Sequence, residues 1–288
     1  MSGLGLLVAS APAHADDFEH AIPELVTAPA AAAKWLEGCS VLVTPRGEVR
    51  RPCKIALADL VGAQTGVTLK PTHVKSVSFP RSMLTWNEAD VEARVGGKVI
   101  ATFRLIEIGS SLGNPDGPNG GWSVTAQSWT RIVSDKEATD RAKAGKLVAP
   151  KLAGYTEAPG KELDDQDKSD REAGLESLKS QWTSTEDKKP LLGSMLDDDA
   201  VVFGSAGERL SGKASAKAIR KWPLGLRQQG ALAIGGDKMV QWAVTQVIGT
   251  SNGVAIPFTT FVVYIQRLTD GGSFTSAPAI VAFGVPAP

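Results

Sequence analysis

The sequence predicts an α+β protein built from two units, each with helices packed on a curved antiparallel sheet. The chain of 288 residues is long enough for two domains of ordinary size. With 42% apolar and 22% charged residues, it has the composition of a globular protein. The two halves also run through the same kinds of segment in the same order, which indicates an internal repeat.

In the first half, "SVLVTPRGEVRRP" predicts a short hairpin, because β-branched residues precede the turn formers Pro45-Arg46-Gly47. Two alternating segments follow, "NEADVEARV" and "KVIATFRLIEI", joined by Gly96-Gly97. A last β segment, "GWSVTAQSWTRIV", closes this half. We therefore expect a hairpin, a helix and a meander of long strands.

The second half repeats this order. "LDDDAVVFGSAGERLSGKASAKAIRKW", residues 196–222, reads as an acidic turn, a short strand, a glycine-rich turn, a polar strand and a helix. Gly204 and Gly207 are expected to allow positive φ in the turn. The segments "KMVQWAVTQVI", "AIPFTTFVVYIQRL" and "SFTSAPAIVAFGV" then match the long strands of the first half. Gly207-Glu208 follows Gly47-Glu48 at an offset of 160 residues.

A charged segment rich in helix breakers separates the halves and leads into an amphipathic stretch with Leu175, Leu178 and Trp182 on one helical face. This pattern predicts a boundary near Gly154–Gly160. The expected organisation is a signal peptide, a degenerate first domain, a charged linker and a second domain, at 1–15, 16–150, 151–172 and 173–288.

The N-terminus has features of an export signal. Residues 4–11 are apolar, and Ala13-His14-Ala15 precedes Asp16 as a small-x-small cleavage site would, although no Lys or Arg stands before Leu4. The run is too short to span a bilayer, so no stable membrane insertion is expected. We expect a periplasmic or extracellular protein. The alternative is a retained apolar terminus with Met1 intact, in a cytoplasmic protein.

The two cysteines flank the first hairpin. Folding its strands about Arg46 places Cys39 opposite Cys53, and facing positions of an antiparallel pair are close enough for a disulfide. Such a bond fits an exported protein. The alternative is a pair of buried free thiols.

Several residues of the second half resemble the nuclear transport factor 2-like superfamily, the cone-shaped fold of ketosteroid isomerases, polyketide cyclases and many secreted bacterial proteins. The matching residues are Asp197-Asp198-Asp199, Gly204-Ser205, Gly207-Glu208, Gly212 and Ile256-Pro257-Phe258. The first half departs from the pattern, with Thr44-Pro45 in place of Gly204-Ser205. The resemblance implies two cone folds in tandem and says little about function.

The resemblance also implies a pocket on the inside of the curved sheet of the second half, where isomerases and dehydratases of this superfamily place an acid, a Tyr or a His, and it makes the first half the structural partner. Trp242, Phe258 and Tyr264 are the candidate ligand-binding residues of the second half. Asp237 and Tyr264 are weak candidates for a proton-transfer pair. The alternative is that Trp242 and Tyr264 are ordinary core residues and that Asp237 belongs to a turn.

Charge and motifs exclude other classes of function. Lys and Arg together number 31, as do Asp and Glu, so no overall field attracts nucleic acid. The sequence lacks a metal-ligand pattern, a nucleophile elbow and a phosphate loop. We expect no metal and no cofactor.

Three functions remain. The favoured one is a non-catalytic exported protein that binds a small apolar molecule or a protein partner in a cone pocket or on a sheet face. The alternatives are an isomerase- or dehydratase-like enzyme in the second domain and a structural assembly module. The assembly module would form a homodimer through an exposed sheet face. The alternative is a pseudo-dimer within the chain, in which the two sheets pack on each other.

Overall fold

The protein is described by a computed structural model that covers residues 13–27, 36, 39, 41–50, 53–78, 84–110, 123–147, 200–211, 227–236, 240–251, 253–268 and 274–286. Several sequence predictions lie outside these residues: the apolar run at 4–11, the boundary and linker at 151–172, the amphipathic stretch at Leu175–Trp182, the acidic turn at 197–199, the helix that follows Gly212, and Asp237. Among the described helices, none is both long enough and apolar enough to cross a lipid bilayer.

The described chain forms three helices and twelve strands. In chain order these are α1 (Ala13–Thr27), β1 (Val41–Val43), β2 (Val49–Arg50), α3 (Leu57–Val61), β3 (Val67–Ser78), β4 (Leu84–Val95), β5 (Lys98–Ser110), β6 (Ser123–Arg131), α4 (Asp135–Lys143), β7 (Val201–Phe203), β8 (Arg209–Ser211), β9 (Arg227–Gly236), β10 (Val240–Ser251), β11 (Val254–Leu268) and β12 (Phe274–Gly284).

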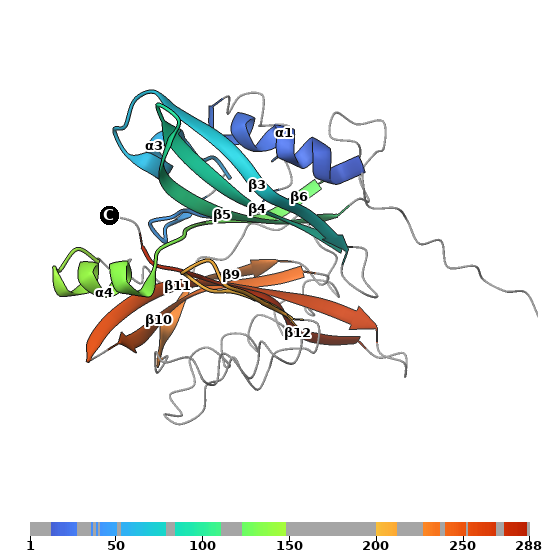
Figure 1. Cartoon of the computed structure of the whole chain (residues 1–288). Coiled ribbons are helices and arrows are strands. Elements are labelled where there is room, and N and C mark those ends of the chain that lie inside the picture. The colour runs from blue at the N-terminus through green and yellow to red at the C-terminus, as the bar shows by residue number, and fades with distance from the viewer. Residues whose placement is uncertain are drawn as a thin grey trace, which may run out of the picture.

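The strands form two six-stranded sheets with the same topology, β2-β1-β6-β5-β4-β3 and β8-β7-β12-β11-β10-β9. Each sheet is antiparallel apart from one parallel pair, β1 with β6 and β7 with β12. The expected fold class, α+β with two units, is confirmed. Figure 1 shows the two sheets stacked face to face, with α1 on the far side of the first sheet and α4 beside the second.

The long strands predicted by alternation all form. They correspond to β4, β5 and β6 in the first sheet and to β10, β11 and β12 in the second. Both short hairpins form as well, and the pairing of Leu42 with Arg50 centres the first on Arg46. Gly47 and Gly207 have φ of 76° and 97°, whereas Gly204 has no positive φ, so that expectation was wrong for Gly204.

The edge strands β3 and β9 were not predicted. In β3 exposed and half-buried residues alternate, so the strand carries little of the apolar signal that marks the central strands. Pro71 lies in β3, and a register shift between Thr72 and Lys75 interrupts its ladder with β4. Lysine, proline and an irregular ladder are features by which edge strands resist further pairing.

The inner faces of the two sheets share one hydrophobic core. It contains Trp86, Ile106 and Ile108 from the first sheet and Trp242, Phe261 and Val263 from the second. Trp86 meets Phe203 edge to face, with ring centroids 5.8 Å apart. Gly284 is required by this packing, because a Cβ there would lie 2.8 Å from Cγ2 of Thr130.

Two arginines at the edge of this core join the sheets. Arg209 donates from Nε to both carboxylate oxygens of Glu88, at 3.0 and 3.1 Å, and lies over the Trp86 ring. Arg104 pairs with Asp90 and donates to the carbonyl oxygens of Gly207 and Glu208. Both arginines thereby satisfy polar groups of the opposite unit.

The outer faces are covered separately. Along α1, Phe18, Ile22, Leu25 and Val26 form one buried stripe on the first sheet, together with Leu60 of α3. Helix α4 begins with Ser134, whose Oγ accepts a hydrogen bond from the Glu137 amide. It packs its buried Ala138 against the outer face of the second sheet, although it follows the first unit in the chain.

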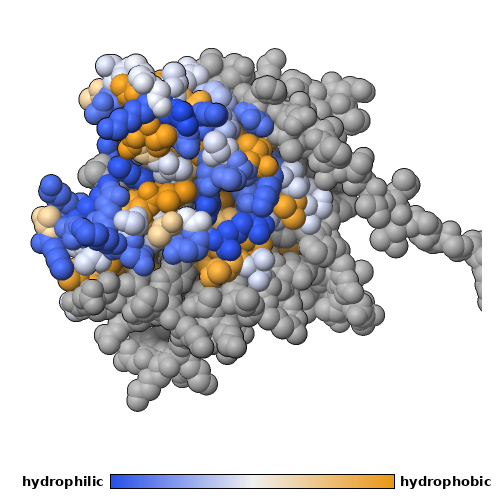
Figure 2. All heavy atoms as spheres, in the orientation of Figure 1, coloured by the Kyte–Doolittle hydropathy of each residue, from blue (hydrophilic) through white to orange (hydrophobic). Residues whose placement is uncertain are grey.

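With their sheet faces covered, few large apolar residues of the described chain reach the surface. On the face drawn in Figure 2, hydrophobic residues form separate patches among hydrophilic ones. Val99 and Ile100 are the large apolar residues that are exposed, at 41% and 38%.

Because the core is shared, the two units are expected to unfold together. Phe203→Ala removes a buried ring that contacts both sheets and should lower the free energy of unfolding by about 3–5 kcal/mol, in a single transition. Chemical denaturation followed by tryptophan fluorescence measures this. The exposed Val99→Ala is the control and should change stability by less than about 0.5 kcal/mol. Two transitions, only one of them shifted, would contradict the shared core.

Candidate functional site

A row of three polar side chains is buried on the outer face of the first sheet. Asn87, Glu107 and Gln127 face one another across β4, β5 and β6, in direct register. Their exposed fractions are 1%, 0% and 0%. We call these three residues the polar row. A wholly buried carboxylate is costly unless its oxygens accept hydrogen bonds, so this placement requires an explanation.

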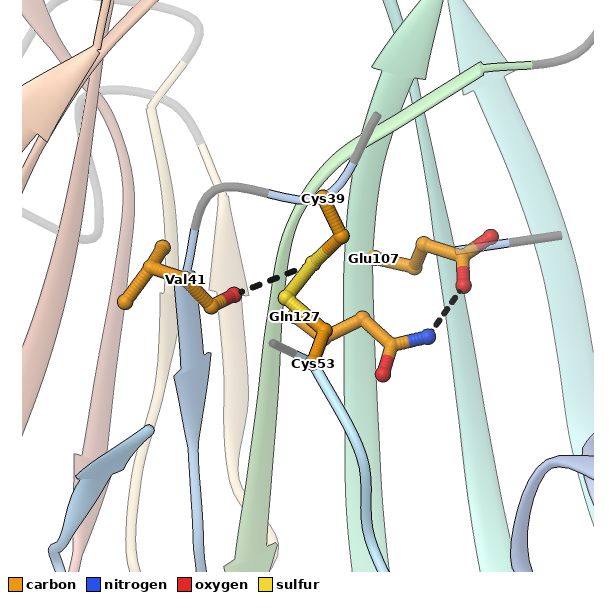
Figure 3. The surroundings of a disulfide bond; sticks show 5 residues. All are labelled: Cys39, Val41, Cys53, Glu107 and Gln127. Carbon is orange, nitrogen blue, oxygen red and sulfur yellow. Dashed lines mark hydrogen bonds between the residues drawn. A yellow bond between two sulfur atoms is a disulfide. The ribbon is translucent and has the colours of Figure 1, made fainter. Parts of the chain in front are cut away.

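Both neighbouring amides bind the Glu107 carboxylate. Gln127 donates from Nε2 to Oε2 at 2.6 Å, and Asn87 donates from Nδ2 to Oε1 at 3.4 Å. Figure 3 shows the Gln127 amide directed at the carboxylate, in the surroundings of the disulfide. Two amide donors on one carboxylate are the arrangement expected for its ionised, acceptor-only form.

Two acceptors of the row are left over. Among the described residues, Oδ1 of Asn87 and Oε1 of Gln127 are buried without a hydrogen-bond partner, and so is Nε1 of Trp129. Trp129 lies beside the polar row, in the next row of the same face with Ala89 and Leu105. A carboxylate flanked by two free amide oxygens is complementary to a group that donates hydrogen bonds.

The sister sheet shows what the fold itself requires at these positions. The register of its strands places Ala243, Val262 and Val281 where the first sheet has Asn87, Glu107 and Gln127. All three are completely buried in the core of the second unit. An apolar row therefore satisfies the same architecture, so the polar row is not a demand of the fold.

The polar row lies next to β1, which a disulfide holds in place. Cys39 and Cys53 form a disulfide with Cα atoms 5.9 Å apart, at the facing positions expected from the hairpin. Sγ of Cys39 also lies 3.3 Å from the carbonyl oxygen of Val41, the first residue of β1. Leu42 of the same strand pairs with Gln127. The disulfide thus fixes the strand beside the row.

The candidate residues of the second half do not converge. Phe258 and Tyr264 lie on the outer face of β11, six residues apart and in one apolar cluster. Trp242 is on the opposite face, in the core between the sheets, because it pairs with Val263. Asp237 is outside the described residues. The binding role of Trp242, Phe258 and Tyr264 stays a prediction.

The outer face of the second sheet has its own polar pair, which the sequence reasoning also missed. Thr245 and Thr260 are paired across β10 and β11 and are completely buried. Within the described chain, neither hydroxyl has a hydrogen-bond partner. A hydroxyl is far less costly to bury than a carboxylate, so the first unit has the stronger candidate site.

Comparison with known proteins finds no matching family model and no matching curated protein. Among solved structures, the chain is similar to nuclear transport factor 2 from Cryptosporidium parvum, with 11% identity, a TM-score of 0.28, and coverage of 44% of this chain and 99% of that one. An NTF2-like protein of unknown function from Pseudomonas putida has 13% identity, a TM-score of 0.31, and coverage of 42% and 88%. A LEH-like epoxide hydrolase from M. tuberculosis has 18% identity, a TM-score of 0.27, and coverage of 42% and 86%.

Replacing the polar row by the apolar residues found at the equivalent positions of the second sheet tests whether the polar row lowers the stability of the fold. Glu107→Val alone leaves two buried amides without an acceptor and should cost about 1–3 kcal/mol per amide. The triple variant Asn87→Ala, Glu107→Val, Gln127→Val removes both amides together with the carboxylate that they bind and should be more stable than Glu107→Val. Chemical denaturation of both variants measures the difference. A triple variant less stable than Glu107→Val would show that the row supports the fold.

Proposed function

We propose that the protein is an exported, non-catalytic binding protein that holds a small, largely apolar molecule on the α1-covered face of the first unit. The observation that carries this is the completely buried Glu107, in a position where the sister sheet has Val262. The second sheet forms the same topology without a charge at this position, which supports a role for Glu107 beyond the fold.

The chemistry of the row defines the ligand. Its carboxylate and the two amide oxygens are acceptors, so the ligand presents a hydroxyl or amino group that donates hydrogen bonds. The surrounding side chains, among them Leu105, Phe103 and Trp129, are apolar, so the rest of the ligand is apolar too. Sites of this kind join many apolar contacts with a few polar groups that fix orientation.

The same carboxylate favours a second candidate, an isomerase- or dehydratase-like enzyme. A carboxylate held between two amides could accept a proton from a bound substrate, as general base catalysis requires. This moves the candidate base from Asp237 in the second domain to Glu107 in the first. Recovery of an unchanged ligand would favour binding, and turnover of the recovered molecule would favour the enzyme.

The assembly alternative needs an uncovered apolar sheet face. The inner faces of the two sheets already cover each other, with Trp86 and Trp242 in one core. This supports an intramolecular pseudo-dimer over a homodimer through the same faces.

Two observations support export. A disulfide is stable in the periplasm or outside the cell, and Cys39–Cys53 forms one. Cleavage after Ala15 would remove only the first three residues of α1, and its buried residues Phe18, Ile22 and Leu25 would remain.

A bound ligand should be seen by native mass spectrometry of the wild-type protein as an added mass. The triple variant Asn87→Ala, Glu107→Val, Gln127→Val should lose it, because the polar anchor is gone. The matched control is Thr245→Val with Thr260→Val, which removes the polar pair of the sister face and should keep the ligand. Loss of the mass in the control alone would move the site to the second unit. A bare wild-type protein would contradict the proposal.

Export predicts a mature chain that begins at Asp16 and carries the Cys39–Cys53 disulfide. Intact-mass measurement of the protein from the exported fraction of its own organism, before and after reduction, reads both features. An intact Met1 with two free thiols in the cytosolic fraction would contradict export.

A further inference from the structure

A second candidate site lies at the far end of the same outer face. A cavity of about 340 Å³ opens between the first hairpin, α3 and the start of β5. Its lining includes Arg46, Leu60, Val61, Ile100, Ala101 and Arg131. Its volume is within the range of small-molecule sites.

The cavity is positively charged. Asp59 also lines it, but the Oδ2 of Asp59 already accepts from Nη1 of Arg50 at 2.9 Å and from the Ala56 amide at 2.7 Å. Among the described residues, neither Arg46 nor Arg131 forms a salt bridge. The guanidinium groups of both arginines can therefore bind an anionic group of a molecule that enters the cavity.

The positive charge of Arg131 is only partly compensated by its surroundings. Burial lowers the pKa of its guanidinium, and the nearby Arg141 cation lowers it further, against the opposing attraction of Glu137. Glu137 is itself paired with Arg141. An anion beside Arg131 would restore the stabilisation that its cation has lost.

Gln64 also lines the cavity, and the remaining side chains of the lining, such as Leu60, Val61 and Ile100, are apolar. Ile100 is one of the two large apolar residues that are exposed in the described part of the chain, and Leu60 and Ala101 continue the apolar wall inward. A bare inorganic ion would leave this wall in water. An occupant with both an anionic group and an apolar body uses the whole lining.

We propose that this cavity binds a small amphiphilic organic anion, with its charged group between Arg46 and Arg131 and its apolar body against Leu60 and Ile100. Its position differs from that of the polar row. Arg131 is four residues beyond Gln127 on β6, which is about 13 Å along a strand. The site therefore does not depend on the binding function proposed for Glu107.

The test uses octanoate as the probe and isothermal titration calorimetry on the full chain. Octanoate should bind the wild-type protein, and Arg131→Gln and Arg46→Gln should each weaken it by about tenfold or more, as expected for the loss of a hydrogen bond to a charged group. Ile100→Glu places a carboxylate at the exposed rim and should weaken binding as well. Lys75→Gln, which removes an equal charge outside the cavity, is the control and should leave the affinity unchanged.

Two further probes separate the parts of the ligand. Acetate lacks the apolar body and 1-octanol lacks the charge, so each should bind at least about tenfold more weakly than octanoate. If acetate bound as tightly as octanoate, the ligand would need no apolar body. If 1-octanol bound as tightly as octanoate, the ligand would need no anionic group. Either result would contradict the proposal. No octanoate binding, or binding that survives Arg131→Gln and Arg46→Gln, would overturn the proposal.

The variant Asn87→Ala, Glu107→Val, Gln127→Val distinguishes octanoate binding in the cavity from octanoate binding at the polar row. It should bind octanoate as the wild-type protein does. If it loses octanoate while Arg131→Gln retains it, octanoate occupies the polar row and the cavity proposal fails. Thermal unfolding of Arg46→Gln, an exposed turn position, checks that weakened binding does not come from unfolding.

Discussion

Each sheet of this protein has a large apolar cluster on both faces, and both clusters have to be removed from water. The inner faces solve this together, because Trp86 of one sheet and Trp242 of the other occupy equivalent register positions in a single core. Arg209 and Glu88 close its edge with a pair that crosses between the units. Once the inner faces are paired, only the outer faces and the ends of the sheets are left for binding.

The repeat provides an internal control that a single domain lacks. Both sheets have the same strand order, so a residue in one has a counterpart in the other that experiences the same topology. Where the counterparts agree, as with Trp86 and Trp242, the fold explains them. Glu107 and Val262 are equally buried, but burying a carboxylate is less favourable than burying an aliphatic side chain. The shared topology therefore does not explain why position 107 has a glutamate.

Much of the fold can be predicted from the sequence because its signals are local. Alternation marks the central strands, and the turn residues around Arg46 set the register of the first hairpin and bring the two cysteines opposite each other. The edge strand β3 was missed because an exposed edge carries little apolar alternation, and the ladder of β3 with β4 is interrupted near Lys75. The parallel pairing of β1 with β6 joins segments far apart in the chain, which no local pattern specifies.

The polar row was harder to predict than the strands that carry it. Its three residues come from three strands, and only the register between strands brings them together. One signal was available in the sequence: in "FRLIEI" Glu107 has the parity of Phe103 and Leu105, so it lies on the apolar face. Trp242 and Tyr264 illustrate the opposite error, since each was assigned to a sensible face of its own strand while the register places them on opposite sides of the sheet.

The two units cover their equivalent outer faces with different elements. In the first unit α1, α3 and the disulfide enclose a face that runs from the polar row through Leu105 and Trp129 to Arg131. In the second unit the matching face receives α4, whose Ala138 joins the cluster of Phe258 and Tyr264. A helix that follows the first unit thus helps to cover the second, which links the two units beyond their shared core. The polar row thus lies in the unit whose outer face is covered by elements of its own part of the chain.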